Sequence, residues 1–352
     1  MTLDTIREQI KPVDEKSMKQ AGEHWLKVAK PLFSLGKLET AVVRMAGMKK
    51  TADYVLKKKG LIIMCADNGV VAEGVTQTGQ EVTAIVADNF TRHETSACIM
   101  SEVASVDTFP IDIGMVTDVP SVTIAENKVA YGTRNFAKEP AMTREEVLQA
   151  LEIGIRIVKE KKEQGYDILA TGEMGIGNTT TSSAVAAVLL RENVSNVTGR
   201  GAGLDSAGLA RKIRVIEEAI ARYQPDPEDV IDVLSKVGGL DIAGLAGVYL
   251  GGAIYGIPIV IDGFISEVAA LCAVKIDGKV RDYMLPSHVS KEPAGKRLLD
   301  ELELSPFITC DMCLGEGSGA VAVMPLLEMG LSVYRRMSTF EEIKVEQYEV
   351  LK

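Results

Sequence analysis

Short apolar runs that end in turn residues alternate along the chain with segments of helical periodicity. The runs cover 61–65, 106–113, 166–170 and 258–261, and each leads into glycine or acidic residues. A short, continuous apolar run with a turn behind it is typical of a strand buried on both faces. Strands that alternate with helices predict an α/β fold, in which helices cover both faces of a parallel sheet.

Helix signals lie between these runs. Thr143 and Glu146 match the capping-box pattern, and apolar residues follow at helical spacing as far as Val158. An Ala-rich segment after Thr180 predicts a second helix, and an apolar segment over 242–255 predicts a third.

The two chain ends have their own pattern. Residues 13–59 are basic and predict helices that Pro31 and Gly36 break into pieces. The charged tail after Gly330 is also expected to be helical.

Composition and charge exclude several classes of protein. The chain of 352 residues carries a formal charge of −10, which argues against a nucleic-acid partner. The 20 residues between Asp241 and Asp262 are uncharged, as in a membrane span, but five glycines and Pro258 favour a buried helix followed by a strand. Five widely spaced cysteines and an acidic start, Met1 to Asp4, predict a cytoplasmic protein without disulfides.

Polar residues gather where the predicted strands end. The clusters are Asp67-Asn68-Gly69, Gly172-Glu173 and Asp262-Gly263. Because ligands of open α/β sheets bind at the carboxyl ends of the strands, we expect the functional site there.

One glycine loop is a candidate for binding an anion. It opens the Ala-rich helix and contains Gly175, Gly177, Asn178, Thr179 and Thr180. Glycines allow close approach of a ligand, and a helix N-terminus offers free N–H groups to a phosphate. A tight turn capped by threonine explains the same residues, and the Gly-Lys-Ser/Thr ending of a Walker A loop is absent.

Two further glycine clusters carry candidate chemistry. Gly199 to Asp205, with Gly201 at its centre, precedes Lys212, which is either a phosphate ligand or a surface lysine. Glu316 stands between Gly315 and Gly317 and is either a general base in a cleft or a turn residue that caps the next helix.

Signals for a metal or a nucleophile are weak. Cys310 and Cys313 form a C-x-x-C without a second ligand pair, so we expect no zinc site. Ser287 and His288 lack the G-x-S-x-G context of a nucleophile, and a capping or ligand-contact role suits them better.

Taken together, these motifs resemble the nicotinate-nucleotide–dimethylbenzimidazole phosphoribosyltransferase family of cobalamin synthesis. The matching segments run in family order at 66–75, 80–83, 172–180, 199–205, 238–243, 261–266, 287–293 and 314–320. The resemblance implies a Rossmann-like parallel sheet with flanking helices and a small helical domain built from both chain ends. It places the small domain at about 1–35 and 290–352 and the α/β domain at 36–289, and it implies a homodimer.

The same resemblance implies an activity and a set of site residues. Family members transfer phosphoribose from nicotinate mononucleotide to a benzimidazole nitrogen, giving an α-ribotide and nicotinate, without a cofactor or metal. Glu316 matches the catalytic base and Glu173 a second active-site carboxylate. The loop from Gly175 to Thr180, with Gly201, Lys212 and Ser290, matches the phosphate and ribose site, and Gln80, Met174 and Leu314 match the base pocket.

The sequence departs from the family pattern near the implied base pocket. Asn68 stands where the family has histidine, and Thr78-Gly79 replaces an aromatic residue and a proline. These changes leave the accepted base open. A noncatalytic or paralogue-dependent nucleotide-binding subunit is the alternative function, whereas an NAD-type oxidoreductase would need a strand and an acid about 20 residues after the loop, which the sequence lacks.

Overall fold

The computed structural model describes residues 2–350 and contains a five-stranded sheet in the order β2-β1-β3-β4-β5. All paired neighbours run parallel. The strands are β1 (Lys59–Ala66), β2 (Asp107–Gly114), β3 (Ile168–Met174), β4 (Ile259–Ile261) and β5 (Met284–Pro286). The predicted α/β class is confirmed, and four of the five strands fall on the predicted apolar runs.

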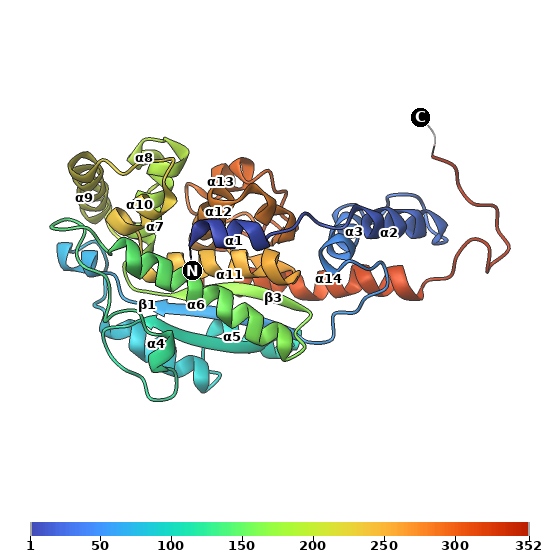
Figure 1. The fold of residues 1–352 in the computed structure, drawn as a ribbon, viewed down its shortest axis with the longest axis horizontal. Coiled ribbons are helices and arrows are strands. Elements are labelled where there is room, and N and C mark those ends of the chain that lie inside the picture. The colour runs from blue at the N-terminus through green and yellow to red at the C-terminus, as the bar shows by residue number, and fades with distance from the viewer. Residues whose placement is uncertain (1, 351–352) are drawn as a thin grey trace.

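Helices lie on both faces of this sheet (Figure 1). Between the strands they are α4 (Glu81–Thr91), α5 (Ser96–Ala104), α6 (Arg144–Glu163), α7 (Asn178–Leu190), α8 (Val194–Val197), α9 (Ser206–Tyr223), α10 (Val230–Val237), α11 (Leu240–Tyr255) and α12 (Phe264–Ile276). The predicted capping box opens α6: Thr143 and Glu146 each bond the other's backbone. Helix α11 packs along α6, and glycines on α11 let the two backbones approach closely.

Helices α1 (Leu3–Gln9), α2 (Glu15–Lys27) and α3 (Lys37–Lys49) precede the sheet, and α13 (Gly295–Glu301) and α14 (Ser318–Arg336) follow it. Helices from both halves of the chain, α2, α3 and α14, meet at one side of the molecule (Figure 1), whereas α1 packs on α11 and α13 on α12. Helix α3 packs on both α2 and α14, away from the sheet's centre, as Figure 1 shows. The division into an α/β domain and a small helical domain stays a prediction.

Three expectations about these elements were wrong. Residues 50–58 are not helical, because Lys50 adopts a left-handed conformation that ends α3. The tail is helical to Arg336 but not beyond. Strand β3 continues past Ala170 to Met174, because its pairing with β1 extends that far, so Glu173 lies in a strand rather than in a loop.

The apolar segment 242–255 forms the buried helix α11, which leads into β4 as predicted. Within residues 2–350, no helix is long and apolar enough to cross a membrane. The charge-free stretch therefore belongs to the hydrophobic core of the protein, because α6 and α12 cover its helix.

Candidate active site

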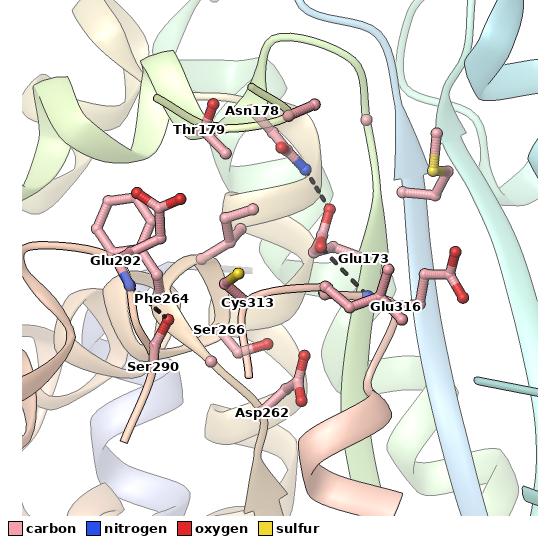
Figure 2. Close-up of a pocket in the computed structure, with 18 of the residues that line it drawn as sticks. Glu173, Asn178, Thr179, Asp262, Phe264, Ser266, Ser290, Glu292, Cys313 and Glu316 are labelled. Carbon is pink, nitrogen blue, oxygen red and sulfur yellow. Dashed lines mark hydrogen bonds between the residues drawn. The ribbon is translucent and has the colours of Figure 1, made fainter. Parts of the chain in front are cut away.

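A cavity of about 230 Å³ opens at the carboxyl edge of the sheet. Residues from the ends of β3 and β4, from the glycine loop before α7 and from the loop before α14 surround it (Figure 2). Nine predicted site residues line it: Glu173, Met174, Gly175, Asn178, Thr179, Gly201, Ser290, Leu314 and Glu316. The prediction of a site at the carboxyl ends of the strands is therefore supported by geometry.

Glu316 sits on a strained, tightly held turn. Its φ is +61°, and the flanking Gly315 and Gly317 have φ of +90° and +88°. Glycine tolerates this left-handed region, but glutamate rarely adopts it, so the surrounding contacts must hold the turn in place. A Cβ at Gly172 on β3 would collide with the Glu316 carbonyl, so this glycine lets the turn lie directly on the strand.

Two carboxylates hold the turn. Asp262, just after β4, accepts backbone N–H groups from Gly317 at 3.2 Å, Gly319 at 2.7 Å and Ala320 at 3.1 Å. Glu173 accepts the N–H of Glu316 itself at 3.4 Å (Figure 2). Asp262 thereby occupies the anion-binding end of α14, which leaves that helix terminus unavailable to a substrate phosphate.

Glu173 also connects the Glu316 turn to the glycine loop. The side-chain amide of Asn178 donates to Glu173 and, at 3.0 Å, to Asp241. All three groups are buried. Asn178 therefore joins two carboxylates with its own donors, and its amide protons are engaged by the protein.

Burial dominates the acid–base character of the site. It raises the pKa of Glu173 to about 8, with the neighbouring Asp241 charge adding to the shift. It raises the pKa of Asp241 and of Asp262 each to about 6. Burial also raises the pKa of Glu316, whereas the N–H of Ala97 lowers it. A carboxylate with a raised pKa in a cavity is suited to accept a proton near neutral pH.

The two glycine loops converge at the opposite end of the cavity. The Nζ of Lys212 on α9 donates to Thr179 Oγ1 at 2.9 Å and to the Gly199 carbonyl at 3.2 Å. Gly201 packs over the same pair of side chains. Lys212 is fully buried and is not the surface lysine of the alternative interpretation; burial lowers its pKa to about 8, while Glu292 raises it.

The N-terminus of α7 has no side-chain cap. Its N-cap is Gly177 in the left-handed region. Thr180 Oγ1 is buried and has no hydrogen-bond partner. An uncapped helix N-terminus with a neighbouring lysine is an arrangement that can hold an anion.

Ser290, Glu292 and Phe264 line the side of the cavity that faces away from Glu316 (Figure 2). Ser290 Oγ accepts the N–H of Glu292 at 3.3 Å. Burial raises the pKa of Glu292, and Lys212 lowers it.

Four predicted residues lie behind or beside the cavity rather than on its surface. Gly177, Thr180 and Lys212 form the layer beneath Thr179. Gln80 precedes α4 and donates to the Asn68 carbonyl at 3.2 Å. Asn68 itself is buried, donates to the Ile176 carbonyl at 3.4 Å and supports the glycine loop from below.

Sequence reasoning assigned no role to Asp241, Asp262 or Glu292. The signal for Asp262 was present, because it directly follows a predicted strand. Asp241 gave no such signal, since it lies 63 residues from Asn178 in the sequence and becomes its neighbour only in the folded chain. His288 also lines the cavity, and its Nδ1 lies 2.9 Å from Ser287 Oγ.

The cysteine pair forms no metal centre among the described residues. Cys310 and Cys313 are free and exposed, and residues 2–350 contain no group of three His, Cys, Asp or Glu arranged to hold a metal. The glycine loop likewise lacks the context of a dinucleotide site, because helices α8 to α11 follow α7 before the next strand.

Comparison with known proteins shows to which family this chain belongs. A phosphoribosyltransferase family model matches residues 10–345. The chain belongs to the nicotinate-nucleotide–dimethylbenzimidazole phosphoribosyltransferase family. Proteins of that name from Ruminiclostridium cellulolyticum and Clostridium acetobutylicum are 44% and 46% identical to it, and each match covers 100% of both chains.

Structural comparison agrees with this membership of the family. The crystal structure of CobT from Thermus thermophilus matches with a TM-score of 0.89 at 36% identity, covering 95% of this chain and 100% of that one. The likeness therefore extends over nearly the whole chain.

Proposed function

We propose that this protein transfers 5-phosphoribose from nicotinate mononucleotide to a benzimidazole-type base, producing an α-ribotide for the lower ligand of a cobamide, and nicotinate. The names of the relatives support this activity. The observation that carries it is the layout of the cavity: an uncapped helix terminus with a buried lysine lies at one end, and a held carboxylate lies at the other.

The phosphate and ribose would lie along the cavity from α7 towards Glu316. We place the phosphate beside Gly175, Thr179 and Gly201, with Lys212 behind Thr179, and the sugar beside Ser290. Fixing the phosphate aligns the anomeric carbon with the incoming base, and such alignment can supply a large part of the rate enhancement.

The reaction then needs one proton acceptor. The bond from the anomeric carbon to the nicotinate nitrogen breaks, and the electron pair neutralises the pyridinium cation. A benzimidazole nitrogen forms the new bond, while its other nitrogen gives up a proton to the carboxylate of Glu316. A general base of this kind contributes typically 10²–10⁴-fold to the rate.

The remaining carboxylates assist Glu316. Glu173, with a pKa of about 8, is neutral in much of the population at pH 7, so it adds little negative charge beside the base. Met174 and Leu314 line the same end of the cavity and provide apolar contacts for an aromatic ring, and Gln80 approaches from α4.

We further propose a homodimer in the cytoplasm, as the family resemblance implies.

Incubation of the purified protein with nicotinate mononucleotide and dimethylbenzimidazole tests the proposal. Mass spectrometry should detect the α-ribotide and an equal amount of nicotinate. Binding of the nucleotide without release of nicotinate, at any base concentration, would instead support the noncatalytic alternative.

A further inference from the structure

The carboxylate of Glu316 reaches out of its own turn to a helix on the neighbouring part of the sheet. Its Oε2 accepts the backbone N–H of Ala97, at the start of α5, at 3.1 Å. We propose that this Ala97 amide is a positioning group for the catalytic base, which fixes the direction of the carboxylate and favours its anionic form. The inference rests on the proposed role of Glu316 as the base.

The Ala97 donor is available because of how α5 is capped. Thr95 is the N-cap, and its hydroxyl accepts the N–H of Cys98 at 3.3 Å. Its carbonyl accepts the N–H of Ile99 at 3.0 Å. The first N–H groups of a helix have no partner within the helix, so the amide of Ala97 needs an acceptor from elsewhere. Ala97 is fully buried, and Glu316 supplies that acceptor.

Both ends of this hydrogen bond belong to elements that pack together. Helix α5 packs against α14, which begins two residues after Glu316, and against β2. The Cys98 thiol contacts the Phe90 carbonyl at 3.4 Å and Thr108 Oγ1 at 3.7 Å, which ties the first turn of α5 to its surroundings. The donor is therefore as fixed as the turn that carries the acceptor.

The charge of Asp262 disfavours an anionic Glu316. Asp262 lies at the end of β4 and bonds the backbone of the turn, whereas Glu173, against the Glu316 amide at the end of β3, has a pKa of about 8 and adds little charge at pH 7. Burial and the Asp262 charge raise the pKa of Glu316, and the Ala97 N–H opposes them. Loss of this donor should therefore raise that pKa further and leave less base ionised at pH 7.

Proline at position 97 removes the donor itself. Ala97 is the second residue of α5, so its N–H takes no part in the hydrogen bonds of the helix and proline there removes none of them. We expect Ala97→Pro to shift the acidic limb of the kcat profile upward by roughly one pH unit, so that kcat falls by roughly tenfold at pH values below that limb. Activity should recover at higher pH, and KM for nicotinate mononucleotide should stay unchanged.

Ser96→Pro is the matched control. Ser96 is the first residue of α5, and Thr95 before it is extended, as a residue before proline prefers. This variant keeps the Ala97 N–H, so its pH profile should match the wild type. Equal shifts in both variants would show that proline perturbs the helix generally and would overturn the inference.

A second measurement does not depend on the folding of a variant at position 97. In the wild-type protein, the amide resonance of Ala97 should move with pH and show the same apparent pKa as the acidic limb of kcat. It should not titrate in Glu316→Gln. If the Ala97 resonance does not change with pH while Glu316→Gln loses most of its turnover, the role of Ala97 would be overturned and the role of Glu316 as the base would stand. Full turnover in Glu316→Gln would instead contradict the proposed function of this residue.

Discussion

Asp262 Oδ1 accepts the backbone N–H of Gly319 at 2.7 Å, so a residue at the end of β4 caps the helix that follows the Glu316 turn. The same carboxylate also accepts two more N–H groups of that turn. The strained conformation of Glu316 is therefore stabilised from outside its own loop, by a side chain more than fifty residues away in the sequence.

Replacement of this cap should disturb both stability and turnover. Asp262→Asn leaves one acceptor oxygen and turns an NH₂ group towards backbone donors, which should cost about 1–3 kcal/mol of unfolding free energy. We also expect kcat to fall by more than about tenfold, because the turn loses its anchor. Denaturant unfolding and steady-state kinetics measure the two effects. Asp118→Asn, at an exposed ion pair with Lys128, is a control that should change neither by much.

Lys212 should matter for the phosphate and not for the base. Lys212→Ala should weaken nicotinate mononucleotide far more than nicotinate riboside, because only the mononucleotide carries the anion. Comparison of kcat/KM for the two substrates gives the answer. Equal losses for both would assign Lys212 a structural role in joining Thr179 to the Gly199 loop.

Glu173 should make the fold less stable as pH rises. Its pKa of about 8 lies above the ordinary glutamate value near 4.5, so the folded state holds a proton that the unfolded state releases. The stabilisation is complete below about pH 4.5 and is lost as pH rises through about 8. The difference in unfolding free energy between wild type and Glu173→Gln, measured from about pH 4 to 9, should therefore decline with pH. A difference that grows with pH would mean that Glu173 is held as an anion.

The accepted base depends on the pocket near Gln80. We predict a roomier and more polar pocket than one suited to dimethylbenzimidazole alone, because Thr78-Gly79 removes bulk and Gly79 loosens the backbone before Gln80. Benzimidazoles with polar substituents, and purines, should be accepted with losses below about tenfold, and phenols least readily. A competition among dimethylbenzimidazole, hydroxybenzimidazole, adenine and p-cresol at equal concentrations measures this. A preference for dimethylbenzimidazole above about 10²-fold would contradict it.

Asn68 connects Gln80 with the glycine loop. Its carbonyl accepts from the Gln80 amide at 3.2 Å, and its side-chain amide donates to the Ile176 carbonyl at 3.4 Å. Its effect on substrates should therefore act through the position of Ile176 and Gly177 rather than through direct contact with the base.

The sequence predicted the elements of the fold well because their signals are local. Apolar runs, the Thr143 capping box and the apolar segment before β4 each depend on neighbouring residues. Strand β5 was missed because three apolar residues, Met284 to Pro286, carry too little pattern to stand out. The end of β3 was placed too early because glycine and glutamate are typical of a turn, while pairing with β1 keeps them extended.

In the candidate site, too, features with local sequence signals could be predicted and contacts between distant residues could not. Glycine loops and the residues they contain could be recognised, since their spacing is local. The contacts that organise them could not: Asn178 meets Asp241, and Glu316 meets Ala97, only after distant helices have packed. The burial that raises the pKa of Glu173 also comes from the fold as a whole.

In the proposed reaction, the Glu316 carboxylate accepts the proton of the incoming base. The most direct measurement is kcat of Glu316→Gln with nicotinate mononucleotide and dimethylbenzimidazole, together with the affinity for the nucleotide. Glutamine keeps the size of the side chain and an oxygen that can accept the Ala97 N–H, so folding and nucleotide binding should persist. We predict that kcat falls at least about 10²-fold. Turnover close to that of the wild type would contradict this role of Glu316.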